Sequence, residues 1–219
     1  MPTSTVEDYL KAILSEQQAR PGALVTMGRI GSALGVAPGT VTAMVKTLAD
    51  SGLVSYERYS GVRLTTAGSQ LAMHVLRRHR LIELFLVKVM GMDWGDVHEE
   101  ADRLEHAVSE ALVERMDEML GFPSTDPHGD PIPTPQGVVD EPQLESLLEC
   151  EVGSERAVVR VADQEPDFLR LVEEAGLKPG GRVSVRARNE AADTIEIEVG
   201  GRTLSLGHRA ASKILVEPA

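Results

Sequence analysis

The chain has 219 residues, which is enough for one large domain or two to three small ones. Because 42% of its residues are hydrophobic and 26% are charged, we do not expect the whole chain to be disordered. Its 22 basic and 34 acidic residues give a net charge of −12, which argues against a protein that coats nucleic acid or an anionic membrane with its whole surface. It lacks both an apolar run of about 18 residues and a secretory signal, so we expect no membrane association.

Three short helices are predicted first, over residues 9–17, 27–34 and 40–50. Apolar side chains recur in each at the spacing that places them on one helix face. Thr26 is suited to begin the second helix as its N-cap, and Gly35 is suited to end it. This part of the chain is therefore expected to be helical with an apolar core.

Residues 53–59 and 62–65 flank Ser60-Gly61 and predict a small hairpin. Helix, tight turn, helix and hairpin form a winged helix-turn-helix, which places its second helix in the DNA major groove. Small and hydroxylic residues at the start of that helix suit close approach to DNA, although such a fold can also serve protein contacts. The predicted DNA-binding residues are Thr26, Pro38, Gly39, Thr40, Thr42, Lys46, Arg58 and Arg63.

Two longer helices are predicted over 66–90 and 96–120. On the first, His79 and Glu83 are spaced i, i+4; on the second, four residues fall on one face at 100° per residue: His98, Asp102, Glu105 and His106. Two imidazoles and two carboxylates on one face indicate either a solvated polar stripe or a divalent-cation site. Their spacing fits neither a metalloprotease nor a di-iron bundle. Nothing beyond these ligands suggests the open coordination position and general base that a metal-dependent enzyme needs, so we expect no enzyme.

Six of the twelve prolines lie between 123 and 142, which predicts a segment without helix or central strand. After it, hydrophobicity alternates with a period of two, and several short strands suggest a small barrel. The strands are expected within 157–161, 183–187, 195–199, 203–206 and 214–217, with one helix over 167–175. The single cysteine, Cys150, cannot form an internal disulfide, so we expect a reduced, cytoplasmic setting.

These boundaries predict three domains: a winged helix-turn-helix over 1–73, a helical metal-binding and dimerisation domain with a proline-rich linker over 74–140, and an SH3-like small β-barrel over 141–219. The fold class is mainly α with small β. The first domain carries a net charge of +1, the second −8 and the third −5. Only the first domain is therefore expected to approach DNA phosphates without repulsion.

In this order, the motifs resemble the diphtheria toxin repressor / manganese transport regulator family of metal-dependent transcriptional repressors. The resemblance covers residues 4–135 most strongly, and residues 97–106, which carry the histidines and acids, are its most specific part. The matching stretches are residues 6–10 (VEDYL), 39–42 (GTVT), 51–54 (SGLV), 78–83 (RHRLIE), 97–106 (VHEEADRLEH) and 129–133 (GDPIP).

The resemblance implies two metal sites per subunit. The first would use Asp8, Asp102, Glu105 and His106; the second would use His79, Glu83 and His98, completed by Gln164 and Asp167, with Glu165 as a rival. Iron members of the family have Met and Cys where this chain has Asp8 and Asp102. Manganese members have acids at both places but also an acid where Lys11 stands. Oxygen-rich ligation favours Mn²⁺, with Fe²⁺ as the alternative.

We therefore expect a homodimeric, metal-dependent repressor that binds double-stranded operator DNA and controls metal-homeostasis genes, with no small organic substrate. The dimer is expected to form through the two long helices, with Leu81, Leu84, Phe85, Val108, Leu112 and Met116 in contact. The alternatives are an Fe²⁺-dependent repressor of iron-uptake genes and a winged-helix regulator that needs no metal.

Overall fold

A computed structural model describes residues 3–219, and the chain divides into two compact units. The N-terminal unit contains the chain up to His79, together with residues 105–108 and 133–139. The second unit contains residues 80–104, 109–132 and 140–219. The boundary falls within a single helix, α4 (Thr66–Lys88).

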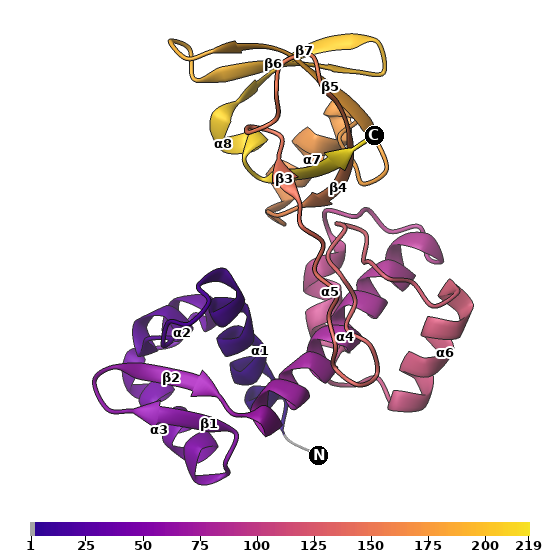
Figure 1. The fold of residues 1–219 in the computed structure, drawn as a ribbon. Helices are drawn as coiled ribbons and strands as arrows, with labels where there is room; N and C mark the ends of the chain where they lie inside the picture. Colours follow the sequence, from indigo (N-terminus) through magenta and orange to yellow (C-terminus); the bar gives the residue numbers. More distant parts are fainter. Residues whose placement is uncertain (1–2) are drawn as a thin grey trace. The chain divides into compact units, whose positions relative to one another are not determined.

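The N-terminal unit contains three helices and a hairpin, which Figure 1 shows in indigo and purple. They are α1 (Ser4–Ala19), α2 (Met27–Leu34), α3 (Pro38–Asp50), β1 (Val54–Glu57) and β2 (Gly61–Leu64). The strands pair antiparallel, with Val54 opposite Leu64. The predicted winged helix-turn-helix is thus confirmed.

One apolar core joins these elements. Leu10 and Ile13 of α1, Ile30 of α2, and Val41 and Val45 of α3 are all fully buried in it. Because α1 shares this core with the helix-turn-helix, α1 and α3 are parts of one packed body.

The single helix predicted over 96–120 is wrong. The structure has α5 (Val97–Leu104) and α6 (Glu110–Leu120), separated by a turn. Ser109 adopts an extended conformation and its side chain accepts a hydrogen bond from the Leu112 backbone N–H, so it caps a new helix. Consequently, Glu105 and His106 lie in the turn after α5, and their expected place on one helix face with His98 and Asp102 is also wrong.

The proline-rich segment forms no named helix or strand within the described residues 121–144, as expected. It is nevertheless packed: Asp126 and residues 128–133 are buried. Gly129 has φ of 86°, and a Cβ there would lie 1.9 Å from the Val159 carbonyl oxygen. Only glycine therefore allows this segment to approach strand β4 (Glu155–Val161) so closely.

The C-terminal part of the second unit is a six-stranded antiparallel sheet, drawn in orange to yellow in Figure 1. Besides β4 it contains β3 (Glu145–Ser146), β5 (Arg182–Asn189), β6 (Thr194–Val199), β7 (Arg202–Gly207) and β8 (Ile214–Pro218), with helices α7 (Pro166–Ala175) and α8 (His208–Ala211). The strand order is β3-β8-β4-β5-β6-β7. The alternating residues Val183, Val185, Ile195 and Ile197 are buried on one side, as their period of two predicted.

Across residues 3–219, the structure contains no helix that is both long enough and apolar enough to span a membrane.

Candidate metal centre

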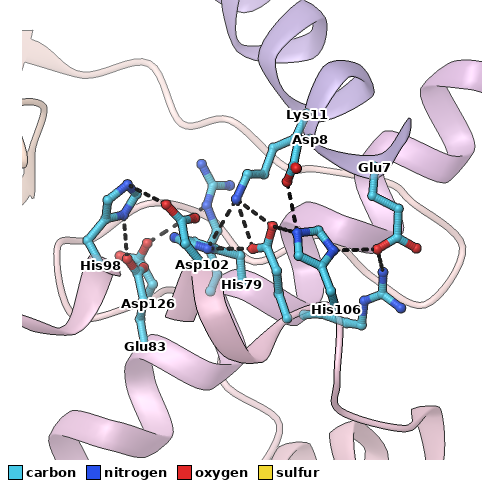
Figure 2. Close-up of polar contacts among 12 residues, drawn as sticks. Glu7, Asp8, Lys11, His79, Glu83, His98, Asp102, His106 and Asp126 are labelled. Atoms are coloured by element: carbon cyan, nitrogen blue, oxygen red, sulfur yellow. Dashed lines mark hydrogen bonds and ion pairs between the residues drawn. The ribbon is translucent and has the colours of Figure 1, made fainter. Parts of the chain in front are cut away.

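Three potential ligands converge in the N-terminal unit, one from α1 and two from the turn after α5. His106 Nε2 lies 2.8 Å from Asp8 Oδ1 (Figure 2). The same nitrogen lies 3.4 Å from Glu105 Oε1. Asp8, Glu105 and His106 each offer a donor atom, and these atoms lie within 4.8 Å of one another. Of the four residues predicted for the first site, the structure therefore brings three together within this unit.

Glu7 and Arg78 fix the orientation of the His106 ring. His106 Nδ1 is 2.7 Å from Glu7 Oε2, and the same oxygen is 2.8 Å from the Arg78 guanidinium. A neutral imidazole that donates Nδ1–H to Glu7 presents the Nε2 lone pair to Asp8. Histidine ligands are commonly held in this way, by a carboxylate on the other ring nitrogen. In that tautomer, the Nε2 lone pair and the Asp8 carboxylate would both be donor atoms for one cation.

Lys11 also reaches this cluster from α1. Its ammonium donates to both Glu105 oxygens, at 2.7 and 2.8 Å, and lies 3.4 Å from His79 Nδ1. His79 Nδ1 in turn lies 2.6 Å from Glu105 Oε2. Glu105 is completely buried, and these contacts offset the cost of burying its negative charge.

The donor set fits a divalent cation. Two carboxylates and an imidazole are the ligands that Mn²⁺ and Fe²⁺ accept, and Glu105 is shielded from water. Glu7 was not among the residues expected at this site, and Lys11 was noted only as a departure from the manganese-type pattern. Their positions one turn apart on the face that carries Asp8 are the signal that indicates them.

A second set of polar residues lies in the second unit. His98 Nδ1 is 3.0 Å from Glu83 Oε1, and His98 Nε2 is 3.8 Å from Asp102 Oδ2. Glu83 is fully buried, whereas His98 and Asp102 are about half exposed. His79 stands one turn before Glu83 on α4, as the i, i+4 spacing predicted.

Asp126 and His128, from the proline-rich segment, also approach Glu83. Together they form a fully buried group whose donor atoms lie within 4.8 Å of one another, and His128 Nδ1 is 4.0 Å from Glu83 Oε2. Burial raises the pKa of Asp126 well above its usual value; the nearby Asp130 and Glu83 raise it further, while Arg80 lowers it. This group was not predicted from the sequence. The pattern that could have indicated it is an Asp and a His two residues apart in a proline-rich turn.

The C-terminal residues predicted for the second site have other partners. Gln164 donates to Asp130 Oδ2 at 3.0 Å. The side chain of Asp167 is 96% exposed and pairs with Arg170 at 2.6 Å. Glu165 is exposed at the start of α7.

Four of the predicted DNA-binding residues, from α3, the wing and the start of α2, line one hollow of about 670 Å³: Thr26, Thr42, Lys46 and Arg58. The Thr26 side chain makes no capping hydrogen bond to α2, contrary to our expectation for its role. Thr42 donates to the Pro38 carbonyl at 2.9 Å, and the Arg58 guanidinium stacks over the exposed Tyr59 ring at the wing tip. Arg63 is exposed on β2.

Comparison with known proteins identifies the class to which this fold and site belong. Residues 1–62 match the iron-dependent repressor N-terminal DNA-binding domain, and residues 65–134 match the metal-binding and dimerisation domain of the same family. Residues 145–218 match the FeoA domain. The chain belongs to the iron-dependent repressor family, as its resemblance to the diphtheria toxin repressor and manganese transport regulator predicted.

Its relatives include an iron-dependent repressor and an HTH-type transcriptional regulator. The iron-dependent repressor IdeR of Mycobacterium tuberculosis (strain ATCC 25618 / H37Rv) is 33% identical over 97% of this chain and 96% of its own length. The regulator MntR of Shouchella clausii (strain KSM-K16) is 34% identical over 56% of this chain and 83% of its own length.

Solved structures show the same fold over nearly the whole chain. A manganese-dependent transcriptional repressor in complex with manganese has a TM-score of 0.87 and 39% identity, over 98% of this chain and 100% of that one. ScaR with bound Zn²⁺ has a TM-score of 0.79 and 32% identity, over the full length of both chains. The predicted fold class, with its winged helix, helical domain and small β C-terminal domain, is confirmed.

Proposed function

We propose that this protein is a dimeric transcriptional repressor that binds operator DNA when a divalent cation occupies the Asp8, Glu105 and His106 cluster. The observation that carries this proposal is the convergence of these three ligands from α1 and the turn after α5. Its homologues, among them IdeR and MntR, are metal-dependent regulators. The genes it controls would be those of metal-ion homeostasis.

Mn²⁺ is the favoured cation and Fe²⁺ the alternative, because Asp8 and Asp102 are hard oxygen donors. The bound cation would supply the positive charge that the acidic ligands share. The family resemblance also implies Asp102 as a ligand of the first site. Ligands must be deprotonated to bind, so the response should fade at low pH.

The second site is proposed at Glu83, with His79 and His98 as its imidazole ligands. The 3.0 Å contact between Glu83 and His98 and the i, i+4 spacing of His79 support it. Asp126 and His128 are rival ligands on the other side of Glu83. Gln164 and Asp167 would join this site only by leaving Asp130 and Arg170, respectively.

Asp8 couples the cluster to the DNA-reading helix. It lies on α1, whose Leu10 and Ile13 are buried in the same core as Val41 and Val45 of α3. Any interaction that fixes Asp8 against residues 105–106 therefore also fixes α3 and the wing. Lys46 and Arg58 at the edge of the hollow would then bind DNA phosphates.

A second copy of the chain is the proposed partner, because one winged helix offers few basic contacts and two half-sites add affinity. Leu81 and Leu84 are buried within the chain itself, so their expected place in the dimer interface is wrong. Leu112, which was also expected in the interface, is 47% exposed, and Met119 and Phe122, at and just after α6, are 56% and 72% exposed. These three are better placed to contact a partner.

The test is binding of labelled genomic DNA fragments, measured by fluorescence anisotropy with Mn²⁺, Fe²⁺ under anaerobic conditions, Zn²⁺ or EDTA. We expect selective binding with Mn²⁺ or Fe²⁺ and loss of at least about tenfold in affinity with EDTA, the range of coupling typical between two linked sites. Asp8→Ala and Glu105→Ala should lose the metal response. Selective binding that is unchanged in EDTA would instead favour a regulator that needs no metal.

A further inference from the structure

The Lys11 ammonium occupies the position from which a cation would bind Glu105. It contacts both oxygens of that carboxylate, at 2.7 and 2.8 Å. It also lies 3.4 Å from His79 Nδ1, and Figure 2 labels both of these residues. Glu105 is completely buried, and the Lys11 side chain is 19% exposed. A single carboxylate is thus already held by a positive charge that the chain itself provides.

The same helix carries a ligand and this internal cation. Asp8 and Lys11 are three residues apart on α1, so both side chains face the turn after α5. Asp8 contacts His106, and His106 Nε2 lies 3.4 Å from the Glu105 oxygen to which Lys11 is bound. The ammonium and the other two ligands, Asp8 and His106, therefore lie close to the Glu105 carboxylate.

A divalent cation and an ammonium cannot both bind Glu105 at these distances without strong repulsion, because the carboxylate is buried and poorly screened by water. One of the two has to leave. The lysine can do so, since its charge sits on a flexible four-carbon chain that already reaches solvent.

We propose that Lys11 is a built-in competitor that sets the cation concentration at which the site fills. This inference rests on the proposed function of the Asp8, Glu105 and His106 cluster. A cation binds only by displacing the ammonium from Glu105, so Lys11 lowers the affinity of the site and raises its threshold. In the absence of a cation, the same ammonium stabilises the fold by pairing with a buried carboxylate.

The two effects of Lys11 have opposite signs, which separates this role from a structural one. A lysine that only supports the site would, when removed, lower both the stability of the protein and its affinity for metal. A competitor, when removed, lowers the stability in EDTA and raises the affinity for metal.

The experiment is calorimetric titration of Mn²⁺ into wild type and Lys11→Met, with thermal unfolding of both in EDTA. We expect Lys11→Met to bind Mn²⁺ about tenfold more tightly or better, as expected for removal of a charged hydrogen bond that the metal must break. Its unfolding midpoint in EDTA should fall. Lys11→Arg, which keeps the charge, should stay close to wild type, and so should Lys178→Met, which removes a lysine paired with Glu173.

A Lys11→Met protein that binds Mn²⁺ no more tightly than wild type overturns the inference and leaves the proposed function standing. A wild type that takes up no Mn²⁺ overturns both. Should the variant not fold, amine labelling of the wild type followed by mass spectrometry decides. Mn²⁺ should increase labelling of Lys11 as its ammonium moves to solvent, and unchanged or decreased labelling contradicts displacement.

Discussion

His106 contacts a carboxylate through each ring nitrogen, Glu7 at 2.7 Å and Asp8 at 2.8 Å. The two acids have different roles, because Glu7 is buried and tied to Arg78 whereas Asp8 is partly exposed and close to Glu105. Glu7 thus positions the His106 imidazole, and Asp8 is placed to bind the same cation as His106.

This division of roles predicts that Glu7→Gln weakens Mn²⁺ binding without removing a ligand. The amide no longer provides a negative acceptor for the His106 Nδ1–H, so we expect a loss of about tenfold in affinity, the lower end for such outer partners. Calorimetric titration of Mn²⁺ measures it. Glu16→Gln, on the same helix but paired with Arg29, is the matched control, and equal affinity in the two variants would contradict the role given to Glu7.

The raised pKa of Asp126 predicts that the free energy of unfolding depends on pH. Burial raises its folded pKa above the unfolded value of about 3.9, so the folded state holds the proton more tightly. Below that unfolded pKa the stabilisation is fully present, and it is lost as the pH rises through the folded pKa.

Relative to wild type, Asp126→Asn should therefore gain stability as the pH rises from 4 to 7, by at most about 1.4 kcal/mol per pH unit. Urea unfolding in EDTA at each pH gives the free energy of unfolding. Asp167→Asn, at a side chain that is 96% exposed, serves as the control. A difference between Asp126→Asn and wild type that does not grow with pH would count against a raised pKa.

At the scale of single elements, the winged helix-turn-helix was predictable because its apolar residues follow the helical period and Gly35 and Gly52 end the helices. The strands after residue 150 were predictable from their period of two. The break between α5 and α6 was not, since residues 97–120 keep a helical pattern and only the Ser109 cap begins a new helix.

The cluster of Asp8, Glu105 and His106 was only partly predictable, because the residues around it come from segments far apart in the sequence. Glu105 and His106 were expected as ligands. The spacing of Glu7 and Lys11 places them on the same face of α1 as Asp8, but their contacts with His106 and Glu105 depend on how α1 packs. Asp126 and His128 lie in a segment whose prolines indicated only an absence of regular structure. Its close packing on β4 is a tertiary property.

The substitution Gly129→Ala tests how much the close packing of the proline-rich segment on β4 contributes to stability. A methyl group would meet the Val159 carbonyl oxygen at 1.9 Å, so we expect the free energy of unfolding to fall by about 2 kcal/mol or more. Gly153→Ala is the control: its φ is also positive, 87°, but nothing lies within 4 Å. Backbone strain alone should cost it about 1 kcal/mol. Equal losses at the two positions would show that close packing on β4 contributes nothing.

At the scale of the whole molecule, α1 links the Asp8, Glu105 and His106 cluster to the proposed DNA-binding helix α3. Asp8 stands on one face of that helix, and the core shared with α3 lies on another. By linkage, operator DNA should tighten metal binding by the same factor by which metal tightens DNA binding. The chain resembles both an iron-dependent repressor and a manganese-dependent one, so metal titration of the purified protein is what distinguishes the two cations.

The most direct measurement is calorimetric uptake of Mn²⁺ by purified wild type, Glu105→Gln and Glu99→Gln, the last an exposed acid on α5. We predict that wild type and Glu99→Gln each bind at least one Mn²⁺ per chain. Glu105→Gln should bind Mn²⁺ at least about a hundredfold more weakly, because an amide replaces a charged ligand. Equal uptake and affinity in all three proteins would contradict the assignment of this cluster as the metal centre.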